Sequence, residues 1–147
     1  MKKKLFLMAS VVLFLCGYLL IAQDTISFKV IVNSSNTTTV LSRKQLSKFF
    51  LKKATKWGNG NKILPVDLLE NSPVREVFSK DIHKRSVTKV RAYWQKQIFS
   101  GRNVPPPQME YEDDIIAFVE ADSGAIGYVS ESTRLSEHTV KIIEIKE

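Results

Sequence analysis

The chain is poor in the residues that most catalytic and metal sites require. Its only cysteine, Cys16, lies inside an apolar run, residues 5–22. Removal of that run excludes a disulfide, a thiol nucleophile and a thiolate metal site. The two histidines, His83 and His138, lie far apart in polar surroundings, which is typical of solvated surface residues. No glycine-rich phosphate loop or metal-ligand spacing occurs. We therefore expect no catalytic residue, no metal and no cofactor, so the chain is predicted not to be an enzyme.

Long apolar stretches are also absent after residue 22. The apolar run at residues 5–22 follows three lysines and precedes Gln23 and Asp24, which is the pattern of a secretory signal peptide. A retained membrane anchor is the rival interpretation, because the run is about as long as a minimal spanning helix. Phe14 and Leu15 before the cysteine differ from the small residues of a lipid-attachment site. We expect a cleaved signal peptide at 1–22, one domain at 24–147, and a periplasmic location.

Charge of one sign is not concentrated enough to indicate a nucleic-acid partner. Without its three leader lysines, the chain has 19 of its 22 basic residues against 15 acidic ones, a formal charge of +4. This value gives a modest preference for anionic partners. The remaining length of about 125 residues suits one domain with its own core.

Apolar periodicity predicts alternating strands and helices. Short β-branched runs predict strands, and polar caps followed by apolar residues at helical spacing predict helices. Pro65 points to the start or the edge of its strand. The alternation predicts an α/β domain, a layered mixed sheet with flanking helices. Strands are expected at residues 26–32, 63–68, 125–129 and 139–145, and helices from 43, at 73–82, from 87 and at 113–121.

Two polar stretches are candidates for binding. Ser72 and Pro73 fit the cap and first position of a helix, and such a cap stabilises a helix by about 1 kcal/mol. Arg75 then falls in the first turn, where the helix dipole disfavours a cation by about 0.3–1 kcal/mol. Its partner is either an internal acid, Asp67 or Glu70, or an external anion.

The second stretch is a hydroxyl-rich loop, "NSSNTTT", at residues 33–39. It follows the first strand, where open α/β sheets tend to bind ligands, or it is a plain polar loop. Trp57, beside a Gly-Asn-Gly turn, is either an exposed contact or a pin that holds the turn to the core.

Three blocks in order resemble one family. "LSRKQLSKFFLKKATKWGNG" at 41–60, "ILPVDLLENSPVREVF" at 63–78 and "ADSGAIGYVS" at 121–130 resemble segments of phosphate-specific periplasmic binding proteins. The resemblance covers residues 28–130 and implies a type II periplasmic-binding-protein fold. Because two lobes need roughly 200–300 residues, it implies one lobe only.

The resemblance also implies a function. It implies a solute-binding protein of a phosphate ABC transporter, holding phosphate or a similar oxyanion at a helix N-terminus. The site residues it suggests are Ser72 and Arg75, with Ser34, Ser35 and Asn36 added from the hydroxyl-rich loop. In this chain Pro73 replaces a glycine of the family pattern and removes an N–H donor, and Val74 replaces a threonine and removes a hydroxyl.

Two functions stay open. In the first, an oxyanion is captured weakly, or together with a second copy or an importer permease. In the second, the lobe has lost its ligand and serves as a periplasmic protein-interaction module, through a surface such as the Trp57 turn or the proline-rich connector at 105–107.

Overall fold

A computed structural model describes residues 25–147. The predicted signal peptide at 1–22 lies outside the described residues. Within the described part, no helix is both long enough and apolar enough to cross a membrane.

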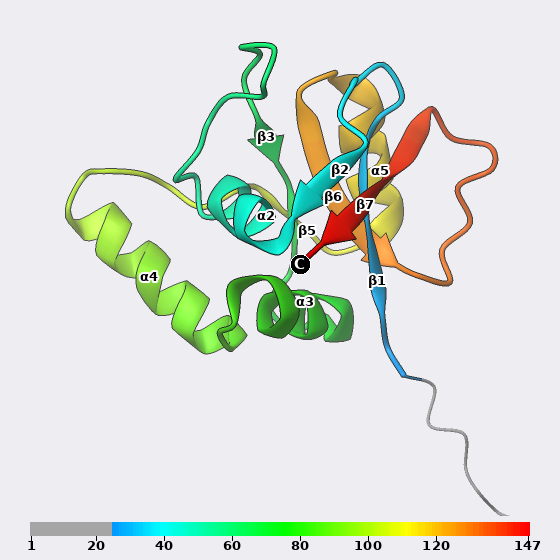
Figure 1. Cartoon of the computed structure of the whole chain (residues 1–147). Coiled ribbons are helices and arrows are strands. Elements are labelled where there is room, and N and C mark those ends of the chain that lie inside the picture. Colours follow the sequence, from blue (N-terminus) through cyan, green and yellow to red (C-terminus); the bar gives the residue numbers. More distant parts are fainter. Residues whose placement is uncertain (1–24) are drawn as a thin grey trace, which may run out of the picture.

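The chain folds around a five-stranded mixed sheet (Figure 1). Its order is β2-β7-β1-β6-β3, and a two-stranded pair, β4-β5, lies apart from it. β1 is antiparallel to both neighbours, β6 and β7, whereas β2 runs parallel to β7 and β3 parallel to β6. The strands are β1 (Phe28–Asn33), β2 (Val40–Ser42), β3 (Leu64–Pro65), β4 (Asp67–Leu68), β5 (Gln108–Met109), β6 (Ala125–Ser130) and β7 (Val140–Lys146).

Helices cover the sheet and complete the core. The helical segments are α2 (Arg43–Phe50), α3 (Pro73–Phe78), the π-helical turn η2 (Ser79–His83), α4 (Val87–Phe99) and α5 (Glu112–Ala121). Val30, Ile31 and Val32 at the centre of β1 have no solvent-exposed surface. Consecutive residues of a strand point to opposite faces, so both faces of β1 are covered. The predicted α/β class, a mixed sheet with flanking helices, is confirmed.

Close packing of α5 on β6 depends on a glycine. A Cβ atom on Gly127 would lie 2.7 Å from Ile115 Cγ2 and 3.0 Å from Val66 Cγ1. Such a contact is too short for any side chain at this position. The bare backbone of Gly127 therefore lets α5 approach the sheet.

The capping signals located the helices well. Ser42 and Gln45 form the predicted capping box of α2, Ser72 caps α3 with Pro73 at its first position, and Ser86 caps α4. The helix predicted at 73–82 changes to π-helical geometry after Phe78 and ends at Lys84, which has a left-handed φ of 53°.

The prediction of a single strand at residues 63–68 is wrong. The structure divides it between two sheets: β3 pairs with β6, and β4 pairs with β5. Pro65 lies in β3, at the edge of the large sheet, as its missing N–H predicts. The short strands β2 and β5 were not predicted.

The Gly-Asn-Gly turn is held to the core by Trp57. This side chain is 5% exposed, and its Nε1–H donates to the carbonyl of Gly124 at 2.9 Å. The sequence left two roles open for Trp57, and the structure shows that it anchors the turn to the core and is not an exposed contact. Trp94 is also buried, in a separate small cluster with Leu51 and Val90.

Candidate functional site

The start of α3 is a self-contained helix cap. The Ser72 hydroxyl accepts the N–H of Arg75 at 3.4 Å, and the Ser72 N–H donates to the carbonyl of Leu69 at 3.0 Å. Pro73, the first residue of the six-residue helix, has no N–H to offer. The cap is therefore explained without a ligand.

Arg75 is buried against Asp67. Its Nη2 lies 3.1 Å from Asp67 Oδ2, and the two side chains are only 3% and 7% exposed. The Nη1 group of Arg75 also donates to the carbonyl of Leu68. Glu70, the other acid that the sequence offered, pairs with Arg91 at 2.9 Å instead. The partner of Arg75 is thus Asp67, and the guanidinium points into the protein.

The Asp67 carboxylate has two further donors. The Tyr128 hydroxyl donates to it, and the N–H of Leu68 donates to Oδ1 at 3.1 Å. Burial raises the pKa of Asp67, and the nearby Arg75 charge opposes this shift. Burial and the Asp67 charge raise the pKa of Tyr128 well above its ordinary value. Among the described residues no buried side-chain nitrogen or oxygen lacks a hydrogen-bond partner. The network is closed.

Two aromatic rings from helices pack against Tyr128 of this network. The rings of Phe78 and Tyr128 are stacked, with centroids 3.8 Å apart and planes 2° apart. Phe50 packs edge-on against both rings. A low-dielectric wall of this kind strengthens the Arg75–Asp67 attraction and keeps water out.

Several polar groups of the hydroxyl-rich loop are hydrogen-bonded within the protein. The Ser34 N–H donates to the carbonyl of Thr139 at 2.9 Å. Ser35 donates from both its N–H and its hydroxyl to Asn33 Oδ1, at 3.0 and 2.7 Å. Asn36 is buried, and its Nδ2 lies 3.4 Å from the carbonyl oxygen of Ser123.

The two predicted parts of the anion site do not meet. α3 lies beside the start of β1, where the rings of Phe28 and Phe78 are 5.2 Å apart. Ser34 follows the other end of β1, and Figure 1 shows α3 and this loop at opposite ends of the sheet. Six residues of strand span roughly 17–20 Å. Ser72 and Arg75 are therefore neighbours, whereas Ser34, Ser35 and Asn36 are remote from them.

The prediction that His83 is a solvated surface residue is wrong. It is buried, its Nδ1 lies 2.9 Å from Ser47 Oγ, and its ring packs edge-on against Phe78. Burial, aided by the charges of Arg75, Arg85 and Lys53, lowers the pKa of His83 to about 4. The imidazole is thus neutral at pH 7. No periodic signal in the sequence marked it, because α2 and η2 meet only in the tertiary structure.

Among residues 25–147, no three histidine, cysteine or carboxylate side chains are grouped so that they could hold a metal ion. His138, at the far end of the sheet, lies 3.3 Å from Glu120 and is partly exposed.

Known proteins resemble this chain in structure. A putative phosphate ABC transporter substrate-binding protein with bound phosphate from Clostridium perfringens matches with a TM-score of 0.63 and 19% identity, over 82% of this chain and 45% of that one. An ABC-type phosphate transport receptor from Vibrio cholerae matches with 0.61 and 20% identity, over 82% and 46%. A possible phosphate binding protein from Planctomyces limnophilus matches with 0.62 and 15%, over 83% and 42%.

The comparisons confirm the predicted fold. No protein-family model matches the chain, and no curated protein matches it in sequence. The chain spans less than half the length of the three solved structures. Its mixed α/β fold matches a single lobe of the periplasmic-binding-protein fold, which confirms the resemblance at the level of structure. These structures are described as a substrate-binding protein and a transport receptor.

Proposed function

We propose that this chain is an exported single lobe of the phosphate-uptake solute-binding type that acts in the periplasm by binding another protein. It does not hold phosphate on its own at the start of α3. The observation that carries this proposal is the buried Arg75–Asp67 pair, 3.1 Å between Nη2 and Oδ2.

The energy of that pair supports the interaction role over phosphate capture at α3. A phosphate bound at α3 must draw Arg75 out of its contact and leave the Asp67 charge buried without a partner. Breaking a buried pair in this way costs about 3–5 kcal/mol. Each 1.4 kcal/mol is a factor of about ten in affinity. The pair therefore weakens any phosphate binding there by about two to four orders of magnitude.

Length supports a role with a partner. The chain covers 42–46% of the three solved structures named above, so this proposal gives it one lobe. A second copy or an importer permease is the kind of protein that completes such a lobe. The proposal includes cleavage of residues 1–22 on export and a folded domain from residue 24.

A second candidate is weak capture of phosphate or a related oxyanion. It is favoured by the likeness to a structure whose description includes bound phosphate. In this candidate there are two partial sites, and another chain completes each of them. One partial site consists of Ser72 and Arg75, and the other consists of Ser34, Ser35 and Asn36 at the far end of β1. Ser34 and Ser35 are exposed, which leaves their surface open to such a chain.

Thermal unfolding of the exported, purified protein tests the choice. A ligand at one hundred times its Kd adds about 2.7 kcal/mol to the free energy of unfolding. We expect millimolar phosphate and sulfate to change Tm no more than sodium chloride of equal ionic strength does. A rise in Tm that is specific to phosphate and saturates with its concentration would reject the first proposal in favour of the second.

A further inference from the structure

A basic hollow lies between α2 and η2, and neither Arg75 nor Asp67 is among its lining residues. Its volume is about 520 Å³. Side chains of α2, of the turn after it and of η2 supply its walls. The lining residues are Arg43, Lys44, Ser47, Lys48, Lys53, Ile82, Lys84 and Glu147. We call this feature the basic hollow.

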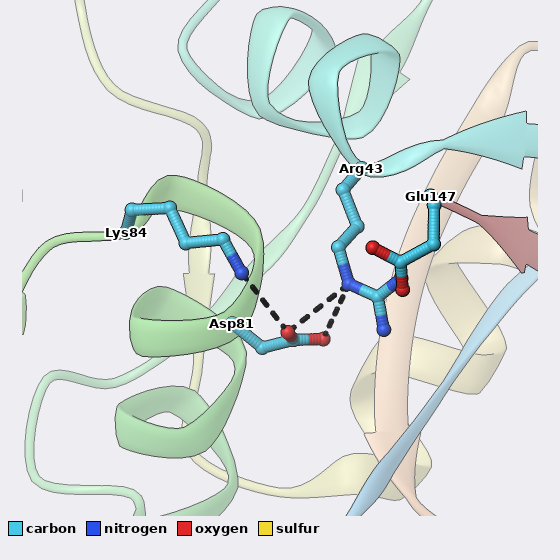
Figure 2. Close-up of polar contacts among 4 residues, drawn as sticks. All are labelled: Arg43, Asp81, Lys84 and Glu147. Atoms are coloured by element: carbon cyan, nitrogen blue, oxygen red, sulfur yellow. Dashed lines mark hydrogen bonds and ion pairs between the residues drawn. The ribbon is translucent and has the colours of Figure 1, made fainter.

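Positive charge exceeds negative charge in the basic hollow. Arg43 Nε lies 3.1 Å from Asp81 Oδ1, and Lys84 Nζ lies 3.4 Å from the same oxygen (Figure 2). Glu147 Oε1 lies 2.8 Å from Arg43 Nη1. Two side-chain carboxylates thus face five cations, and three of the lysines form no ion pair within residues 25–147: Lys44, Lys48 and Lys53.

Two of these lysines, Lys44 and Lys48, carry an electrostatic cost in the fold, although Lys48 lies in the last turn of α2, where the helix dipole favours a cation. Lys44 and Lys48 lie four residues apart on α2, so their like charges share one face and repel each other. Lys44 also lies in the first turn of the helix, where the dipole disfavours a cation, and no acid accompanies it there. An anionic partner bound here would attract both lysines and would offset their mutual repulsion and the unfavourable dipole interaction of Lys44.

Arg43 shows how a carboxylate enters the basic hollow. The side chain of Glu147 is 96% exposed, yet its carboxylate reaches the guanidinium at 2.8 Å. Figure 2 shows Glu147 and Asp81 approaching Arg43 from different segments. A carboxylate presented from outside can take the Glu147 position, because that contact is held only by an exposed side chain at the rim.

We infer that the basic hollow is a docking site for an extended acidic segment of a partner protein. This inference rests on the proposed function and names the surface that would serve it. Concavity favours a narrow segment over a flat anionic membrane, which would touch only the protruding lysine tips. Ile82 and Ser47 line the hollow between the cations, and the Ser47 Oγ lies 2.9 Å from His83 Nδ1.

Binding of a short peptide of alternating glutamate and serine tests the inference. Fluorescence anisotropy at low salt measures its Kd for the exported protein, for K44A/K48A, and for the matched variant K89A/K96A. Lys89 and Lys96 are exposed on α4 and are not among the residues that line the hollow. We expect K44A/K48A to weaken binding by about 2- to 30-fold and K89A/K96A to leave it unchanged. High salt should weaken all binding, as it screens exposed charges.

Other outcomes overturn the inference. Equal loss in both double variants means that net charge alone attracts the peptide. Binding to phosphatidylglycerol vesicles without binding to the peptide identifies a membrane surface. A dimer in sedimentation equilibrium that K44A/K48A abolishes identifies a second copy. A peptide that does not bind rejects the inference while leaving the phosphate test at α3, and so the proposed function, unaffected.

Discussion

Replacement of Arg75 by alanine should destabilise the protein strongly. The change removes the cation 3.1 Å from Asp67 and leaves a carboxylate that is only 7% exposed without its charge partner. Loss of one member of a buried pair costs about 3–5 kcal/mol. The Leu68 carbonyl also loses its guanidinium donor, so the upper part of that range is expected.

The surface pair between Arg91 and Glu70 provides the matched control. These side chains are 51% and 32% exposed and lie 2.9 Å apart. Exposed pairs contribute about 0–1 kcal/mol, so R91A should fall within that range. Both variants remove one guanidinium, so the difference between them measures burial rather than charge.

A double-mutant cycle isolates the pair itself. R75M and D67L should each cost about 3–5 kcal/mol, whereas the double variant should cost much less than their sum. Recovery will be partial, because the Tyr128 hydroxyl then lacks its acceptor. Urea unfolding followed by tryptophan fluorescence measures these values, since Trp57 and Trp94 are buried in different clusters.

Additive single costs in that cycle would refute the reasoning. So would a cost below about 1 kcal/mol for R75A, the value of a solvent-exposed arginine. Either result would mean that Arg75 is free to meet an external anion.

Three further predictions concern the packing around this network. For His83, the pKa falls from 6.5 to about 4 on folding, so stability is full above pH 6.5 and is lost as pH falls toward 4, by about 3 kcal/mol; H83Q should remove that part of the pH dependence in urea unfolding. In G124A the new Cβ would lie 2.2 Å from the backbone oxygen of Lys62, so Tm should fall by the equivalent of about 1–3 kcal/mol, whereas G58A, with open space around it, should be within about 0.5 kcal/mol of the wild type. W57F removes one of the two donors to the Gly124 carbonyl, which still accepts the Leu64 N–H at 3.0 Å, so the lost hydrogen bond should cost about 0.5–1.5 kcal/mol. An unchanged pH dependence in H83Q, or unchanged stability in G124A or W57F, contradicts the corresponding contact.

Local signals in the sequence predicted the helix starts and the fold class. Ser42 with Gln45, Ser72 with Pro73, and Ser86 each mark a helix start by chemistry contained within a few residues. Such caps need no tertiary partner, so the sequence alone located them.

Features that depend on distant residues were not accessible in the same way. Residues 63–68 read as one strand, but pairing partners far along the chain divide it between β6 and β5. The sequence could not tell whether Arg75 pairs with Asp67, with Glu70 or with an external anion, because the pairing depends on the direction of the side chains. The hydroxyl-rich loop and α3 were brought together in the prediction because strand order and register, which separate them, cannot be read from local pattern.

The side-chain resonances of Arg75 test the central claim most directly. In ¹H–¹⁵N spectra of the exported protein, the guanidinium N–H groups of Arg75 should be protected from exchange with water. We expect their positions to stay fixed as phosphate is added to millimolar concentration, because Asp67 and the Leu68 carbonyl occupy the donors. A shift of these resonances that saturates with phosphate would contradict a closed corner and place the anion on Arg75.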